Sequence, residues 1–410
     1  MGKKIAVVGG GAAGLMAAGE AARGGAEVTL FEKNEKLGKK LAITGKGRCN
    51  VTNLCKTGEF LENVATNPKF LHSAINYFGP ADCIDFFEGL GVELKTERGK
   101  RVFPKSDSAF EIVDALKKFA GKSGAKMTHA AVEKLEIRNS KIAGLSAGGQ
   151  KYDFDCVILC TGGVSYPKTG STGDGHRLAK EAGHDIVKLK PSLVPLEIEE
   201  KFCADAMGLS LKNVILRVYD GEKEVFGEMG ELLFSHFGIS GPLALSASSH
   251  MREKNGGYKI KLDLKPALGE AQLDKRVLAD FEKYKNKMFR NALDDLLPKK
   301  LVPVFVGILS DFINPGKKIN EITKAERAKL VGLFKDFPMT FKAFRPMGEA
   351  IVTCGGVNTG EIHPGKMESK LVGGLYFAGE IIDVDAYTGG FNLQIAFSTG
   401  KLAGKCAAES

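Results

Sequence analysis

The sequence predicts an α/β fold whose parallel sheet is assembled from both ends of the chain. The apolar run at residues 4–8 reads as a buried strand, and a glycine-rich turn, an alanine-rich helix and a second strand at residues 27–31 follow it. Near the other end, residues 373–404 read as a strand, another glycine-rich turn and a helix that begins near Asn392. Strands that alternate with helices in this way are typical of a parallel sheet covered by helices.

The interior of the chain has a different pattern. Residues 191–265 read as short strands separated by glycine, asparagine and proline, and residues 266–335 have the apolar spacing of amphipathic helices. We therefore expect three parts, which are a first domain formed by residues 1–190 and 346–410, a β-rich substrate domain at 191–265 and 336–345, and a helical subdomain at 266–335.

The composition is that of an ordinary globular protein. Of the 410 residues, 43% are hydrophobic and 26% are charged, which argues against a largely disordered chain. No apolar run approaches the roughly 20 residues that span a bilayer, and the N-terminus passes into a strand without a leader-like segment. We expect a cytoplasmic protein without membrane insertion. The net charge of +9 permits an anionic partner without identifying one.

Eight cysteines are scattered along the chain without a CxxC pair. This spacing predicts neither a disulfide framework nor a zinc site. It also argues against dithiol–disulfide exchange, which needs two neighbouring thiols. The histidines lack metal-ligand spacing as well, so we expect reduced thiols and no metal.

The first glycine-rich turn has GxGxxG spacing, with Gly9, Gly11 and Gly14 between a strand and a helix. The first glycine permits a tight turn, the second permits close approach of a pyrophosphate, and the third permits close packing of the helix on the strand. Glu32 ends the second strand, where an acidic residue accepts a hydrogen bond from a ribose hydroxyl. This frame predicts a dinucleotide site for FAD or NAD, and the alternative is a strand-to-helix turn without a ligand.

Two further glycine-rich turns favour FAD. The strand at residues 157–160 is followed by a Thr-Gly-Gly turn. The strand at residues 375–378 is followed by Gly379-Glu380, and a helix N-terminus comes after them. An acidic side chain and a helix N-terminus suit a ribityl hydroxyl and the electron-rich edge of an isoalloxazine. No second GxGxxG lies between a strand and a helix. A nicotinamide reductant, NAD(P)H, would therefore bind transiently near the flavin, or electrons would arrive by another route.

Four blocks, in this order, resemble one family over essentially the whole chain. They are TGKGRCNVTN at 44–53, GELLFSHFGISGP at 230–242, VTCGGVNTGEI at 352–362 and MESKLVGGLYFAGEIIDVDAYTGGFNLQ at 367–394. The chain thereby resembles the BaiN/RdsA (YhiN-like) family of FAD-dependent oxidoreductases. The resemblance implies a Rossmann-like FAD-binding domain built from both chain ends, with an inserted β-barrel-like domain and a helical subdomain between them.

The resemblance also implies which residues hold FAD. Carried over by position, the pyrophosphate residues are Gly9, Gly11, Ala13 and Gly14, the ribose and adenine residues are Glu32 and Val132, and those bordering pyrophosphate and flavin are Gly45, Arg48, Cys49 and Asn50. The ribityl residues are Gly379 and Glu380, and the flavin-ring residues are Asn392, Leu393 and Gln394. Further cofactor-binding residues are Ala12 and Lys33, and Thr161, Gly162 and Gly163, which flank the cofactor. Two positions depart from the family pattern, because Phe391 replaces a tyrosine and Ala386 replaces a glycine. If that tyrosine contacts substrate in relatives, Phe391 would be consistent with a different substrate class in this protein.

A flavin that delivers a hydride leaves the protein to position the substrate and to supply a proton. The sequence offers two candidate catalytic donors. His236 precedes a Gly-Ile-Ser-Gly-Pro turn, and Cys49 follows Arg48, whose charge would lower the pKa of the thiol. The alternatives are a packed loop histidine and a small buried residue beneath the flavin.

The resemblance implies three reactions: reduction of uridine to dihydrouridine in large-subunit ribosomal RNA, reduction of a conjugated C=C in a 3-oxo bile acid or similar enone, and oxygen-dependent oxidation of a small amine. A non-catalytic flavin-binding module is a fourth hypothesis. The basic balance favours ribosomal RNA or its precursor as the partner. The sequence makes no prediction of oligomeric state. Two basic clusters are candidates for docking, the alternative being a solvated surface: Lys283, Lys285, Lys287, Arg290, Lys299 and Lys300, and Lys95, Arg98, Lys100, Arg101 and Lys105.

Overall fold

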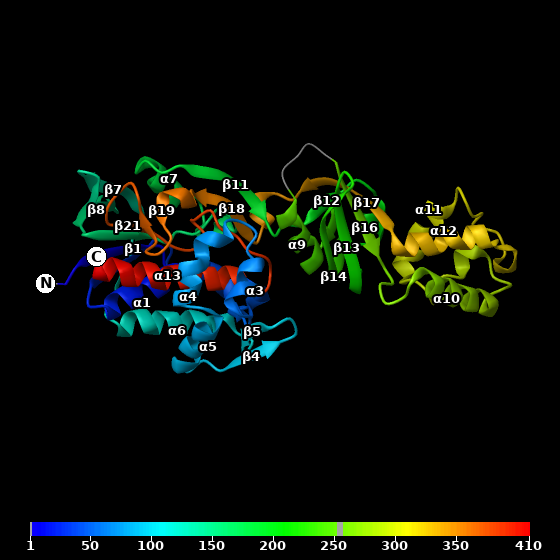
Figure 1. Ribbon diagram of the computed structural model, residues 1–410, viewed down its shortest axis with the longest axis horizontal. Helices are drawn as coiled ribbons and strands as arrows, with labels where there is room; N and C mark the ends of the chain where they lie inside the picture. Colours follow the sequence, from blue (N-terminus) through cyan, green and yellow to red (C-terminus); the bar gives the residue numbers. More distant parts are fainter. Residues whose placement is uncertain (1, 252–256) are drawn as a thin grey trace. The chain divides into compact units, whose positions relative to one another are not determined.

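A computed structural model describes residues 2–251 and 257–410 (Figure 1). The chain forms two compact units. The first consists of Met1–Ser192 and Pro346–Ser410, and the second consists of Leu193–Arg345. None of the helices in the described ranges is long and apolar enough to cross a membrane.

The first unit is built on a seven-stranded sheet in the order β19-β20-β21-β10-β1-β2-β6. The strands from β21 to β6 are parallel, and β20 and β19 are added antiparallel at one edge. This confirms the predicted α/β fold, in which strands from the two chain ends share one sheet. The bounds are β1 (Lys4–Val8), β2 (Glu27–Glu32), β6 (Lys126–His129), β10 (Cys156–Leu159), β19 (Ile362–His363), β20 (Glu368–Ser369) and β21 (Leu375–Phe377).

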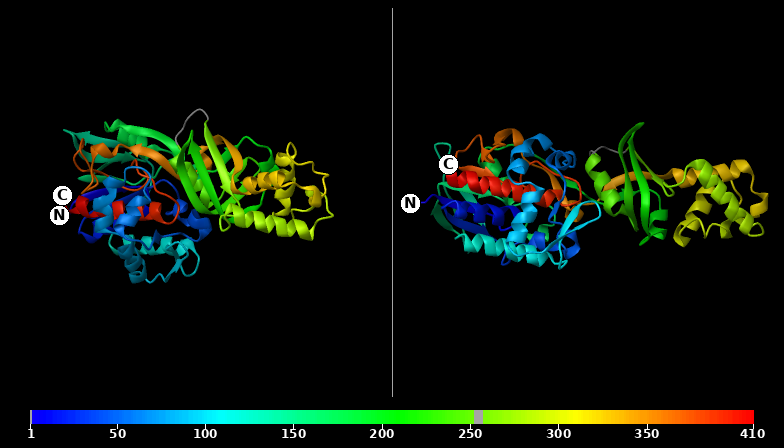
Figure 2. Two further views of the ribbon diagram at one scale, coloured as in Figure 1. Left: turned by 45° about the vertical axis from the view of Figure 1, so that its right-hand side comes forward. Right: turned by 60° about the horizontal axis from the view of Figure 1, so that its bottom comes forward.

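Two helices from opposite ends of the chain, α1 (Ala12–Arg23) and α13 (Phe391–Glu409), lie side by side (Figures 1 and 2). Glycines allow their backbones to approach closely. A Cβ atom added to Gly400 would lie 2.4 Å from the carbonyl oxygen of Ala13, and one added to Gly404 would lie 2.5 Å from that of Ala17. The C-terminal helix is therefore part of the core that positions the first glycine-rich turn.

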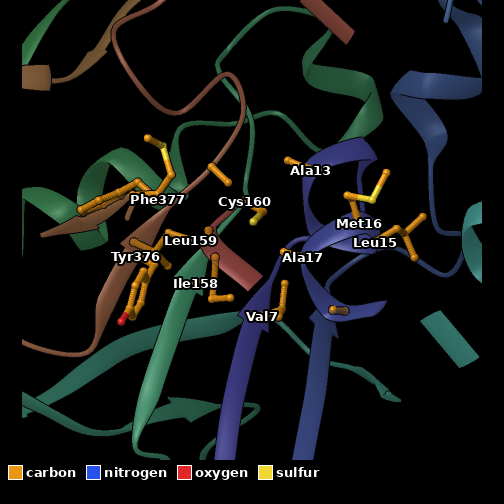
Figure 3. Packing of buried hydrophobic residues seen from close by; sticks show 14 of the residues in the cluster. Val7, Ala13, Leu15, Met16, Ala17, Ile158, Leu159, Cys160, Tyr376 and Phe377 are labelled. Carbon is orange, nitrogen blue, oxygen red and sulfur yellow. The ribbon is translucent and has the colours of Figure 1, made fainter. Parts of the chain in front are cut away.

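Side chains from three adjacent strands form the centre of this core. Val7 of β1, Leu159 of β10 and Phe377 of β21 are fully buried, as is Met16 of α1 (Figure 3). Residues 5–8 of β1 and the whole CVIL run of β10 are apolar and buried because both faces of a parallel sheet are covered.

Smaller elements surround the sheet of the first unit. One antiparallel sheet has the order β3-β5-β4, another has the order β7-β8-β9, and β11 pairs with β18. Helix α6 also packs on α1. The bounds are α2 (Lys39–Ile43), β3 (Thr52–Asn53), α3 (Thr57–Glu62), α4 (His72–Tyr77), α5 (Pro80–Gly89), β4 (Leu94–Glu97), β5 (Arg101–Pro104), α6 (Ala109–Lys122), β7 (Val132–Arg138), β8 (Lys141–Ala147), β9 (Gln150–Asp153), α7 (Asp174–Glu181), β11 (Ile186–Ser192) and β18 (Val352–Val357).

The second unit contains a closed six-stranded barrel in the order β12-β15-β14-β13-β16-β17 (Figure 2). Pairing of β12 with β17 closes it, which confirms the β-barrel that the family resemblance implies. The bounds are β12 (Leu196–Ile198), β13 (Ser210–Asp220), β14 (Lys223–Ser235), β15 (Gly238–Ser240), β16 (Tyr258–Asp263) and β17 (Phe337–Phe344).

Helices complete the second unit and share the core of the barrel. Phe305 stacks on Phe337 of β17, with ring centroids 5.4 Å apart. Helix α9 begins at Pro242, which is favourable at the first helical position, although the sequence pattern there reads only as a turn. The bounds are α8 (Phe202–Asp205), α9 (Pro242–His250), α10 (Glu270–Lys283), α11 (Val302–Leu309) and α12 (Lys324–Lys335), with single 3₁₀ turns η4 (Phe289–Asn291) and η6 (Ile319–Glu321).

Candidate functional site

The turn between β1 and α1 has the geometry of a phosphate-binding loop. Gly9 has φ +103°, and a Cβ on Gly14 would lie only 1.8 Å from the carbonyl oxygen of Gly9. A Cβ on Gly11, in contrast, would meet no described atom within 4 Å. The first and third glycines are thus required by the backbone, whereas the second borders open space. Residues 12 and 13 open the helix, where N–H groups have no partner within the helix.

Glu32, at the end of β2, is held against this turn. Its carboxylate accepts hydrogen bonds from the backbone N–H of Gly10 at 2.7 Å and of Asn34 at 2.8 Å. Its Oε1 also accepts from Asn34 Nδ2 at 2.6 Å, whereas Oε2 accepts only from Gly10 and can accept a further bond, so a ribose hydroxyl fits beside Oε2. The next side chain, Lys33, is already occupied, because its Nζ lies 2.5 Å from Asp174 Oδ2.

The segment before Val132 lies beside the end of β2. The N–H of Ala130 donates to the carbonyl oxygen of Glu32 at 3.1 Å, and Val132 begins β7 as a buried residue. The predicted adenosine residues are therefore brought together around the C-terminal end of β2.

The loop at residues 44–50 is strongly curved. Gly45, Lys46, Gly47 and Cys49 all have positive φ, between 58° and 84°. Asn50 follows with a buried Oδ1 that has no hydrogen-bond partner among the described residues. An unpaired buried amide oxygen is costly, so it indicates a missing donor such as a flavin N–H or a ribityl hydroxyl.

The structure corrects one expectation for this loop. Arg48 does not activate Cys49, because its guanidinium forms ion pairs with Glu97 and with Asp107 and lies 4.3 Å from the ring centroid of Phe103. Cys49 is fully buried, and burial raises the pKa of its thiol to about 12. The expected lowering of this pKa is wrong, since desolvation of the thiolate dominates.

The Thr161–Gly163 turn follows β10. Thr161 Oγ1 is buried without a hydrogen-bond partner among the described residues, and Gly162 has φ +74°. A Cβ on Gly163 would lie 2.3 Å from Thr353 Oγ1. Glycine at this position therefore lets β18 approach the turn.

Glu380 ties several segments of the first unit together. Its carboxylate accepts from Lys40 Nζ at 2.5 Å, from Ser165 Oγ at 3.0 Å and from the backbone N–H of Thr353 at 2.8 Å. The neighbouring Gly379 has φ +77°, and a Cβ there would lie 2.9 Å from the Cβ of Ala13. The two glycine-rich turns from opposite chain ends thus meet directly.

The N-terminus of α13 presents backbone rather than side chains. Asn392 Nδ2 donates to the carbonyl oxygen of Ala386 at 2.7 Å, which fixes the preceding loop. Gln394 is completely buried, and it accepts from Thr52 Oγ1 at 2.6 Å and donates to the carbonyl oxygen of Phe78 at 3.0 Å. These two side chains, predicted at the flavin ring, are bound within the chain, whereas Leu393 is half-buried.

A buried acidic pair in the 379–390 loop was missed by the sequence analysis. Asp385 is 1% exposed and accepts from Ser192 Oγ at 2.6 Å, while Asp383 accepts from Asn67 Nδ2 at 3.0 Å. Burial raises the pKa of both carboxyl groups. The signal was the sequence IIDVDA, since acids that alternate with apolar residues in a buried segment need specific partners.

The other candidate proton donor, His236, belongs to the second unit. His236 is exposed on the turn between β14 and β15 of the second unit, with its ring centroid 5.0 Å from that of Phe237. In the first unit, His176 is buried in α7, and its Nε2 lies 3.2 Å from the carbonyl oxygen of Ile381. Across residues 2–251 and 257–410, no group of three or more His, Cys, Asp or Glu residues could hold a metal, and all eight cysteines are free.

The β4–β5 hairpin cluster is largely neutralised. Lys95 pairs with Asp107 at 2.8 Å, and Lys100 pairs with Glu59 at 2.7 Å. Lys105 is likewise 2.8 Å from a carboxylate oxygen of Glu93. The hairpin therefore offers fewer free cations than its sequence indicates.

The residues of the first unit fit FAD. Space beside Gly11 suits a pyrophosphate, and the unpaired oxygens of Asn50 and Thr161 suit flavin or ribityl partners. Neither α1 nor α13 carries an acidic residue in its first turn, so the positive end of each helix dipole is available to an anion or an electron-rich ring edge.

Fold and site together define an FAD-dependent oxidoreductase. The flavocytochrome c3 fumarate reductase superposes with a TM-score of 0.52 at 18% identity, over 99% of this chain and 78% of that one. A family model, described as the HI0933-like protein Rossmann domain, matches residues 3–406. The chain belongs to this HI0933-like family, which includes the BaiN/RdsA relatives.

The curated relatives that match nearly the full length carry the names of two different reactions. A 3-dehydro-bile acid delta(4,6)-reductase of Clostridium scindens is 32% identical, and the alignment covers 99% of both chains. A ribosomal RNA dihydrouridine synthase of Haemophilus influenzae is also 32% identical, over 96% of this chain and 95% of that one. Sequence similarity to the bile acid reductase and to the dihydrouridine synthase is therefore almost equal.

Proposed function

We propose that this protein reduces a carbon–carbon double bond conjugated to a carbonyl, and that its substrate is uridine in large-subunit ribosomal RNA. The named activities of both full-length relatives fit this class of reaction. In either case a hydride adds to the electron-poor carbon β to the carbonyl, and a proton adds to the neighbouring carbon.

The observation that carries the RNA substrate is a set of exposed cations in the second unit. Lys285, Lys287, Arg290 and Lys318 have no carboxylate partner in the described part of the chain. Free cations of this kind attract a polyanion, whereas a small apolar enone has no need of them.

Each part of the chain has a proposed role. When bound, FAD supplies a hydride from N5 of its reduced ring, and NAD(P)H is the proposed transient reductant. The first unit holds the cofactor through the turns at Gly11 and Gly379. Cys49 is not the proton donor, because a thiol with a pKa near 12 gives up its proton poorly. Its proposed role is to shape the wall of this site. The second unit is the proposed substrate domain, and its His236 is the proposed proton donor.

A second candidate is reduction of a small enone, which the bile acid reductase relative favours with equal identity. Oxygen-dependent oxidation of a small amine ranks third, because the relatives matched over nearly the full length carry names of reductive reactions. An enone reductase would lose no activity at moderate salt, whereas RNA binding weakens steeply with ionic strength.

The decisive experiment measures dihydrouridine in large-subunit rRNA by nucleoside mass spectrometry, in cells with and without the gene. We expect the nucleoside to disappear on deletion and to return with the wild-type gene but not with Gly11→Val. An unchanged dihydrouridine content would reject the RNA substrate. Anaerobic reoxidation of the reduced protein by enones would then test the second candidate.

A further inference from the structure

Two segments of the helical part of the second unit lie side by side, one after α10 and one before η6, and are joined by an antiparallel bridge between Met288 and Lys318. The N–H of Phe289 donates to the carbonyl oxygen of Lys317 at 2.8 Å, and the N–H of Ile319 donates to that of Lys287 at 3.0 Å. The side chains of Phe289 and Ile319 are buried beneath this contact. The exposed cations of the two segments are therefore carried by neighbouring stretches of backbone.

This surface carries a local excess of positive charge. Residues 283–321 contain eight lysine or arginine and four aspartate or glutamate residues, a net charge of +4. Lys285, Lys287, Arg290 and Lys318 are exposed, and within the described ranges none of them is in an ion pair. Their charge is therefore available to an anionic ligand.

Two nearby acids are already engaged by other lysines. Asp295 is engaged by Lys283 at 2.6 Å, and Glu326 is engaged by Lys317 at 2.8 Å. This arrangement is the opposite of that at the β4–β5 hairpin, where the lysines themselves are occupied.

A cavity of about 350 Å³ adjoins the surface, and Arg290 lines it. Its other walls include Asn291, Val302, Val306 and Pro315. The volume is at the lower end of the roughly 300–1,000 Å³ of pockets that hold small ligands. Apolar walls beside an amide and a guanidinium suit an unstacked base, which single-stranded RNA presents for stacking and for hydrogen bonds at its edge.

We propose that this basic surface and its cavity bind a single-stranded segment of RNA, with Lys285, Lys287 and Lys318 on the phosphates and a base in the cavity beside Arg290 and Asn291. The inference rests on the proposed function and names its docking site. The occupant is RNA because the surface joins a polyanion-binding face to a base-sized apolar recess.

The test is binding of a fluorescein-labelled oligouridylate of about 12 nucleotides, a length within single-stranded site sizes, to the FAD-loaded full chain. The variant combines Lys285→Gln, Lys287→Gln and Lys318→Gln, all at exposed positions. Loss of three phosphate contacts should weaken binding roughly 100-fold at about 0.1 M KCl and make the slope of log K against log salt shallower by about 2.

A matched control removes the same charge from the hairpin, with Lys95→Gln, Lys100→Gln and Lys105→Gln. We expect this control to bind RNA within a few-fold of wild type, because its cations are already in ion pairs. If both triple variants weaken RNA binding equally, the loss of affinity follows from the lower net charge of the protein and not from this surface, and the proposal is overturned.

The cavity is tested separately by Val306→Phe, which fills it without changing charge. Binding should weaken at an unchanged salt slope, and unchanged affinity would overturn the base-binding part. Wild-type protein that ignores the oligouridylate but binds phosphatidylserine vesicles would overturn the whole proposal.

Failure of this site and failure of the proposed function are distinguishable. If wild type makes dihydrouridine and the surface variant binds RNA and makes dihydrouridine equally well, the site is wrong and the function stands. If RNA binding depends on these lysines but rRNA dihydrouridine is unaffected by deletion of the gene, the site stands and the function is wrong.

Discussion

Gly11→Val should weaken FAD binding without changing the stability of the apo protein. Gly11 has φ −86° and ψ −165°, an extended conformation that any residue adopts, and a Cβ there meets no described atom within 4 Å. The apo form should therefore unfold within about 0.5 kcal/mol of wild type, as expected for a substitution that removes no contact. The valine would instead fill the space assigned to the pyrophosphate.

The expected loss of FAD affinity follows from the hydrogen bonds displaced. If two N–H groups at the start of α1 lose a charged phosphate, at about 1.5–3 kcal/mol each, binding weakens by about 3–6 kcal/mol, or roughly 10²- to 10⁴-fold. The assay is flavin absorbance per protein after desalting, followed by calorimetric titration of the apo protein with FAD.

A matched control is Gly121→Val in α6, an exposed glycine where a Cβ also meets no described atom within 4 Å. This variant should retain full flavin occupancy. A yellow Gly11→Val protein with wild-type affinity would refute the assignment of the pyrophosphate to this turn.

Three further predictions concern stability, titration and catalysis. Gly14→Ala should destabilise the apo protein by about 1–3 kcal/mol in urea, because its Cβ would lie 1.8 Å from the carbonyl oxygen of Gly9; unchanged stability would contradict the packing described. Burial raises the pKa of Asp385, so the folded protein favours its protonated form and loses stability as pH rises through that raised pKa. Asp385→Asn should thus be more stable than wild type at neutral and alkaline pH, with the difference vanishing below the ordinary pKa of about 3.9; a pH-independent difference in thermal unfolding would reject this origin. His236→Ala should slow reoxidation of reduced flavin by substrate more than reduction of the flavin in stopped-flow experiments, and equal slowing would remove the histidine from proton transfer.

Local signals predicted the cofactor domain well. The tight turn at Gly9, the close packing at Gly14 and the acid at Glu32 are consequences of one strand–turn–helix–strand segment, so the spacing of neighbouring residues contains them. Helix α9 was missed because its start at Pro242 also satisfies the pattern of a turn.

Side-chain partnerships could not be predicted in the same way. Arg48 pairs with Asp107, which is 59 residues away in the chain, and Asp385 is bound by Ser192, which is 193 residues away. Such pairs depend on how distant loops meet; they occupy Arg48, while burial raises the pKa of Cys49. The free cations at residues 285–290 and 318 were distinguishable from the neutralised hairpin only once their partners were known.

The position of β10 between β1 and β21 has a consequence for synthesis on the ribosome. Strand β1 has both of its neighbours, β2 and β10, once residue 159 has emerged, whereas β10 gains β21 and α1 gains α13 only after residues 346–410 have emerged. The Leu193–Arg345 unit, in contrast, is contiguous and is complete earlier. Because domains generally fold as units, the barrel can form while β10 still lacks β21 and α1 still lacks α13, and the two glycine-rich turns meet only at the end of synthesis.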